Sequence, residues 1–131
     1  MVSDETRVLV VDDCDDAAQA LAVGLRLDGY DVRTAANGAD ALALIEAYKP
    51  HCVLLDVDMP VMDGREFSRR MRERYGDDVV LVAITGWDVD DERVAESFVR
   101  VDHYLQKPVS LADLRVILPP VDRPLRADDA V

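Results

Sequence analysis

Four short apolar runs in this sequence each end in residues that could do chemistry. Asp12 and Asp13 follow the first run, Asp56 ends the second, and Thr85 and Lys107 end the third and fourth. Three carboxylates, a hydroxyl and an ammonium group are the parts of a Mg²⁺-assisted phosphoryl-transfer site. These groups can act together only if the fold brings the ends of the four runs to one place.

The apolar runs alternate with segments of helical periodicity, which predicts strand–helix repeats. We expect strands over 8–11, 31–35, 52–56, 79–85 and 103–106, and helices in the intervals between them and over 110–118. Such an alternation implies an α/β fold, with a parallel sheet covered by helices on both faces and right-handed crossovers. In the strand order 2-1-3-4-5 the first and third strands are neighbours, so Asp12, Asp13 and Asp56 would converge at the carboxyl edge.

Local signals set the limits of several helices. Gly29 is expected to stop the first helix, Asn37-Gly38 to form a turn, and Ser110 to cap the last helix, whose Leu111 should face inward. The helix expected over 88–100 has a thin apolar stripe and should be the least firmly packed.

Three carboxylates within a few ångströms of one another cannot all stay ionised cheaply. Either one of them retains a proton with a raised pKa, or a cation holds them. With Mg²⁺, Asp12 and Asp13 would be the main metal-holding acids, and Asp56 would be the nucleophile for a phosphoryl group. Lys107 would then supply a counter-charge to a phosphoryl oxygen.

The neighbouring residues add a donor and space to this hypothetical site. Thr85 offers a hydroxyl donor to another phosphoryl oxygen, and Gly86 beside it leaves room for the group. Each site residue also has a simpler explanation: Asp12 or Asp13 could cap the following helix, Thr85 could be an ordinary β-branched strand residue, and Lys107 a surface charge. The joint placement of all five at strand ends favours the site.

Composition narrows the class of protein. The 131 residues suit one domain, and the net charge of −12 argues against a nucleic-acid binder. No apolar stretch approaches the roughly 20 residues that span a bilayer, and the first residues lack the features of a signal peptide. Cys14 and Cys52 share no motif spacing, so we expect reduced thiols in a cytoplasmic protein.

The sequence resembles the receiver domains of two-component response regulators. The matching stretches are Val10–Asp13, Leu55–Gly64, Ile84–Gly86 and Tyr104–Pro108. They fall within residues 7–118, which we expect to form the receiver, with a lead over 1–6 and a disordered tail over 119–131.

The resemblance implies a flavodoxin-like (βα)5 fold and a function as a phosphorylation-dependent signalling switch. A sensor histidine kinase or a histidine phosphotransfer protein would pass a phosphoryl group to Asp56. Asp13, Asp56 and the backbone carbonyl of Asp58 would ligate Mg²⁺, with Asp12 acting through water and Mn²⁺ able to replace Mg²⁺. Enzymatic activity would be limited to self-phosphorylation from phosphodonors and slow autodephosphorylation.

The family pattern also assigns switch residues. Thr85 would move toward the phosphoryl group while Tyr104 turns inward, and the Lys107–Pro108 bond would be cis, which aims Lys107 at the site. Signals would leave through the helix over 88–100, the strand over 103–106 and the helix over 110–118, to an unknown output protein.

The sequence departs from the family pattern in two respects. Many members have Ala-Gly before the fifth strand, where this chain has Val99-Arg100. Trp87 and Asp58 occupy rim positions, and our hypothesis is that they set the lifetime of the acyl phosphate, Trp87 by shielding it. The other explanation is that Trp87 is an aromatic contact for a partner.

Two other functions compete with the signalling switch. A haloacid-dehalogenase-like phosphatase would use Asp56 as nucleophile and Asp58 as general acid, although that family places its Asp-x-Asp on the first strand. A pseudo-receiver would bind partners without phosphorylation, although it typically lacks a site residue and none is missing here. The sequence leaves open a single-domain regulator, a phosphate shuttle and the receiver of a hybrid kinase.

Overall fold

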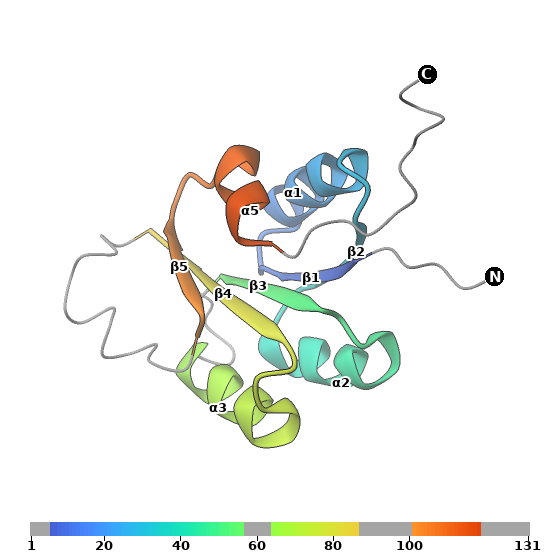
Figure 1. Cartoon of the computed structure of the whole chain (residues 1–131), viewed down its shortest axis with the longest axis vertical. Helices are drawn as coiled ribbons and strands as arrows, with labels where there is room; N and C mark the ends of the chain where they lie inside the picture. Colours follow the sequence, from blue (N-terminus) through green and yellow to red (C-terminus); the bar gives the residue numbers. More distant parts are fainter. Residues whose placement is uncertain (1–5, 57–63, 87–100, 119–131) are drawn as a thin grey trace.

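The computed structural model describes residues 6–56, 64–86 and 101–118 (Figure 1). The helix expected over 88–100, the tail over 119–131, Asp58 and Trp87 lie outside these residues. Within the described part, no helix is long and apolar enough to cross a membrane.

Five parallel strands form one sheet in the order β2-β1-β3-β4-β5, which confirms the predicted topology. The strands are β1 (Arg7–Val11), β2 (Asp31–Ala35), β3 (Cys52–Asp56), β4 (Val80–Thr85) and β5 (His103–Gln106). β3 lies at the centre and is buried along its whole length, and β4 is buried except at its first residue. Continuous apolar runs are typical of parallel strands that are covered on both faces.

Helices cover both faces of this sheet. Figure 1 shows α1 (Asp15–Leu27) and α5 (Leu111–Ile117) on one face, and α2 (Gly38–Tyr48) and α3 (Gly64–Tyr75) on the other. Successive strand residues point to opposite faces, so the core divides in two: Val8 and Val10 pack beneath α1 and α5, whereas Leu9 and Val11 pack beneath α2 and α3.

Caps and turns define the helix ends and correct one prediction. Asn37 does not form a turn; it is the N-cap of α2, and its side chain accepts a hydrogen bond from the backbone N–H of Asp40 at 2.8 Å. Ser110 caps α5 as predicted. Gly29, with φ of 103°, follows the end of α1, and Lys49 ends α2 in the left-handed region.

α5 packs closely against α1 and keeps its predicted inward-facing stripe. Leu114 is fully buried, and Leu111 is half-buried and packs against the same core cluster, where it also lies close to Gly24 of α1. A Cβ atom on Gly24 would come within 2.7 Å of Leu111 Cδ1. The two helices therefore approach closely at a residue without a side chain.

Candidate functional site

The carboxyl edge of the sheet brings three aspartates together. Asp56 is the last residue of β3 and is 6% exposed, and Asp12 follows β1 directly. The pairing of Val11 with Leu55 sets Asp12 beside Asp56. Asp12, Asp13 and Asp56 each offer a carboxylate oxygen, and these oxygens lie within 4.8 Å of one another.

Asp12 is not a helix cap. The N-cap position of α1 belongs to Cys14, whose side chain makes no capping hydrogen bond. Asp12 Oδ1 instead accepts a hydrogen bond from the Cys14 backbone N–H at 2.9 Å, which fixes the carboxylate at the strand end. Burial raises the pKa of Asp12, and the nearby charge of Asp56 raises it further.

Lys107 reaches this cluster from the loop between β5 and α5. Its Nζ lies 3.1 Å from Asp56 Oδ2. The Lys107 backbone N–H donates to the Thr85 carbonyl at 2.8 Å, which ties the end of β5 to the end of β4. The Lys107–Pro108 peptide bond is cis.

Thr85 and Tyr104 lie on the neighbouring strands β4 and β5. Thr85 ends β4 with 1% exposure, and Gly86 after it is exposed. Tyr104 is half-buried, and burial raises the pKa of its hydroxyl. The Asp58 carbonyl and the Trp87 side chain lie outside the described residues, so the roles expected for them stay predictions.

The donor set suits a hard divalent cation. Mg²⁺ takes oxygen ligands, keeps several waters, and binds through a few carboxylates at an open site. The cluster supplies one buried, one half-buried and one exposed carboxylate. A cation would also relieve the repulsion that raises the pKa of Asp12.

Comparison with known proteins identifies the family. Residues 8–118 match the family model of the response regulator receiver domain. This chain belongs to that family. We call Asp12, Asp13, Asp56 and Lys107 the Asp–Lys site. This site and the fold both agree with membership of the family, which favours the receiver over the haloacid-dehalogenase-like alternative.

Curated relatives of this receiver are bacterial regulators. It is 44% identical over 108 residues to the transcriptional regulatory protein PrrA of Mycobacterium tuberculosis, and 42% identical over 108 residues to the response regulator MprA of Mycolicibacterium vanbaalenii. Each match covers 82% of this chain and 46% of the relative. The receiver thus spans about half the length of these regulators.

One solved structure with a similar fold contains a ligand of its own. The response regulator TrrA of Thermotoga maritima, in complex with Mg²⁺ and BeF, aligns with a TM-score of 0.75 and 28% identity. The alignment covers 85% of this chain and 94% of that one.

A groove adjoins the Asp–Lys site on the side of α1. It has a volume of about 470 Å³, and Asp12 and Lys107 line it together with mainly apolar residues. The described residues that line it are Asp12, Ala17, Ala20, Leu21, Ile84, Lys107, Pro108, Val109 and Leu111. We call this the α1–α5 groove. The groove is not predicted from the sequence, because an apolar residue on a helix, such as Leu21 or Leu111, can pack against the core and still line an open groove.

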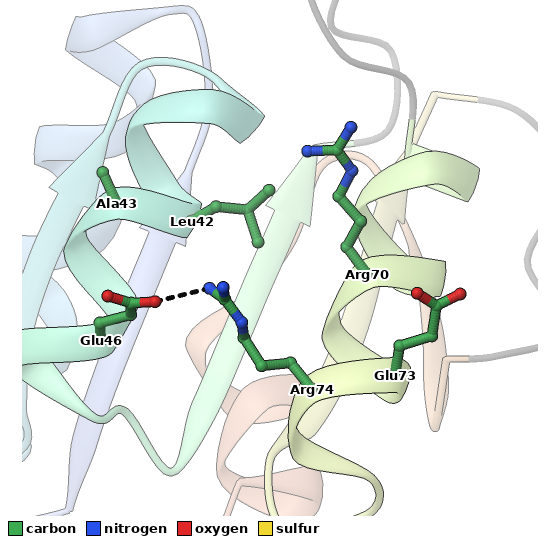
Figure 2. Close-up of a pocket in the computed structure, with 6 residues that line it drawn as sticks. All are labelled: Leu42, Ala43, Glu46, Arg70, Glu73 and Arg74. Carbon is green, nitrogen blue, oxygen red and sulfur yellow. Dashed lines mark ion pairs between the residues drawn. The ribbon is translucent and has the colours of Figure 1, made fainter.

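A second hollow lies between α2 and α3, on the other face of the sheet. Figure 2 shows Arg74 reaching from α3 toward Glu46 on α2, with which it forms an ion pair at 2.7 Å. Arg70 likewise pairs with Glu66 at 2.7 Å. These guanidinium groups already have carboxylate partners from the same surface, so we assign no ligand to this hollow.

Proposed function

We propose that this receiver is a Mg²⁺-dependent phosphorylation switch in which Asp56 accepts a phosphoryl group from a phosphohistidine. The observation that carries the proposal is the setting of Asp56. Its buried carboxylate clusters with those of Asp12 and Asp13, and Asp56 Oδ2 lies 3.1 Å from Lys107 Nζ. A carboxylate can react with an anionic phosphoryl group only where nearby cations offset the repulsion between the two negative charges.

The chain's own residues would act on the transfer in defined ways. Asp56 would attack phosphorus through a carboxylate oxygen, while the P–N bond to the donor imidazole breaks and the imidazole keeps the electron pair. Lys107 would balance charge on one phosphoryl oxygen, and Thr85 would donate to another. Asp12, Asp13 and Asp56 would hold Mg²⁺, which offsets charge on the attacking carboxylate oxygen and on the phosphoryl oxygens when it is bound.

The donor would be a sensor histidine kinase or a histidine phosphotransfer protein. Readout would pass through β5, α5 and residues 88–100, because Thr85 and Tyr104 connect the site to β4 and β5. Thr85 pairs with Gln106 in the sheet, so a shift of Thr85 would displace β5. An output protein that contacts this side would sense the phosphorylated state.

Phosphorylation with a small donor tests the proposal. The protein is incubated with acetyl phosphate and Mg²⁺, and intact mass spectrometry follows the addition of one phosphoryl group. We expect modification that requires Mg²⁺ and is lost in Asp56→Asn. An Asp40→Asn variant is the matched control, because Asp40 is an exposed aspartate on α2.

Two results would contradict the proposal. Modification that persists in Asp56→Asn would place the phosphoryl group elsewhere. Absence of modification with every donor would make the chain a pseudo-receiver. Fluorescence of Trp87, the single tryptophan, gives a second readout of Mg²⁺ and beryllium fluoride binding.

A further inference from the structure

The α1–α5 groove opens directly onto the phosphoryl-accepting site. We propose that the groove binds the aliphatic chain of small acyl phosphates, so that Asp56 accepts phosphoryl groups from four-carbon acyl phosphates in preference to acetyl phosphate. This inference rests on the proposed function, since it names a second donor class for the same carboxylate.

The position of the groove relative to Asp56 supports this assignment. Ile84, in the groove wall, is the residue of β4 that pairs with Asp56 of β3. Asp12 and Lys107 belong both to the groove and to the Asp56 site. When the phosphoryl group of an acyl phosphate lies at Asp56, its short acyl chain can therefore contact the apolar wall of the α1–α5 groove.

The chemistry of the groove selects an anion with an apolar chain. Lys107, whose side chain is 40% exposed, lines the groove, and its ammonium group lies 3.1 Å from Asp56. Leu21, Val109 and Leu111 supply half-buried aliphatic surface to the same groove. A volume of about 470 Å³ lies within the usual range of small-molecule sites, which is about 300–1,000 Å³.

The transfer step balances without a further reactant. A carboxylate oxygen of Asp56 forms a bond to phosphorus, and the bond between phosphorus and the bridging oxygen of the acyl phosphate breaks. The electron pair leaves with that oxygen, so the free carboxylate of the acyl group is the second product. Lys107 would interact with the anion before and after transfer.

Burial of the chain sets the size of the expected preference. Each fully buried methylene favours the bound state by about fourfold. Butyryl phosphate has two more methylenes than acetyl phosphate, so its kcat/KM for Asp56 phosphorylation should be about 5- to 15-fold higher in this partly open groove. Binding energy from a part of the donor that does not react can raise kcat/KM in this way.

The experiment compares donors on the full chain with Mg²⁺ present. Mass spectrometry measures the rates with acetyl, propionyl and butyryl phosphate, and with phosphoramidate, which has no chain. In Ala17→Phe the new ring would fill the groove, and the rate ratio of butyryl to acetyl phosphate should fall to near one. Ala39→Phe is the matched control, because Ala39 is an exposed alanine on α2, and it should keep the wild-type ratio.

Binding without transfer gives an independent readout. In 2-oxopentylphosphonate and 2-oxopropylphosphonate a methylene replaces the bridging oxygen of butyryl and acetyl phosphate, so neither can donate. As inhibitors of phosphorylation by phosphoramidate, the longer compound should bind about 5- to 15-fold more tightly. Ala17→Phe should remove this difference.

The outcomes separate this inference from the proposed function. Equal rates for acetyl and butyryl phosphate, with modification still at Asp56, would overturn the inference and leave the function intact. A chain-length preference that survives Ala17→Phe would also overturn it. If no donor modifies Asp56, both the proposed function and the donor preference are wrong.

Discussion

Lys107 Nζ lies 3.1 Å from Asp56 Oδ2, across 51 positions of sequence. The contact depends on two anchors of the lysine: its backbone N–H donates to Thr85, and the loop after it continues into α5. The lysine side chain is 40% exposed, whereas the Asp56 side chain is 7% exposed. A solvated cation thus faces a buried carboxylate at the mouth of the site.

Replacing this lysine should slow phosphorylation. In Lys107→Met the counter-charge to a phosphoryl oxygen is lost, and we expect the rate with acetyl phosphate to fall by about 100-fold, the usual effect of deleting one stabilising donor. Mass spectrometry measures the rate. Lys49→Met is the matched control, because Lys49 is the other lysine of the chain and also precedes a proline. An unchanged rate in Lys107→Met would show that the ion pair is only structural.

Mg²⁺ should stabilise the folded protein. A ligand that binds only the native state adds about 2.7 kcal/mol at a free concentration of about a hundred times Kd. We expect thermal unfolding at higher temperature in Mg²⁺ than in EDTA, and loss of most of this difference in Asp13→Asn. Asp16→Asn, which removes an exposed aspartate of α1 outside the cluster, should keep the difference. The same shift in both variants would mean that Mg²⁺ binds elsewhere.

His51 should make stability depend on pH at the opposite edge of the sheet. Its Nδ1 accepts a hydrogen bond from the Arg7 backbone N–H at 2.9 Å, which requires the neutral ring. Burial lowers the pKa of His51 from 6.5, and the charge of Arg7 lowers it further. As the pH falls, His51 of the unfolded chain is therefore protonated at a higher pH than His51 of the folded protein. This contribution to stability is present above pH 6.5 and is lost as the pH falls through and below that value.

Urea unfolding at several pH values checks the effect of His51. An asparagine can accept the same hydrogen bond but does not titrate, so His51→Asn should lose less stability than the wild type between about pH 7.5 and about pH 5.5. His103→Asn is the control for the second histidine. Equal pH dependence in the wild type and in His51→Asn would assign the loss to carboxyl groups instead.

The sequence predicts the sheet and the acidic cluster well, because both depend on strand ends. An apolar run followed by Asp56 defines a buried strand and the polar residue that ends it. The repeat of strands and helices predicts a parallel sheet, and the resemblance to receiver domains implies its strand order. The prediction is poorer where two helices meet. Periodicity correctly places Leu111 on an inward stripe. It does not predict that α5 approaches α1 closely at Gly24, because that contact depends on two helices that are far apart in the sequence.

Asn37 shows a second limit of local patterns. Asn-Gly is typical of a turn, and the same asparagine is also a preferred N-cap. The choice depends on whether a helix follows within one residue, as it does here at Gly38. The groove was missed for a similar reason, because residues of an apolar stripe look alike whether they line a core or an open wall.

Arg72 should stabilise the start of β5 more than a surface arginine can. Its side chain is 13% exposed, and it donates to the carbonyls of Gly76 and Val79 and to Asp102 Oδ2 at 2.7 Å. The same Asp102 oxygen accepts the Leu81 backbone N–H at 2.8 Å, so α3, β4 and the residue before β5 share one network.

Removing the guanidinium group leaves several of these acceptors without that donor. We expect Arg72→Met, which keeps much of the length of the side chain, to lower the free energy of unfolding by about 2–3 kcal/mol. Denaturant unfolding measures the change. Arg70→Met on the same helix removes a half-exposed arginine paired with Glu66 and should change stability little. Equal losses in the two variants would mean that the network around Asp102 contributes no more than the exposed ion pair of Arg70.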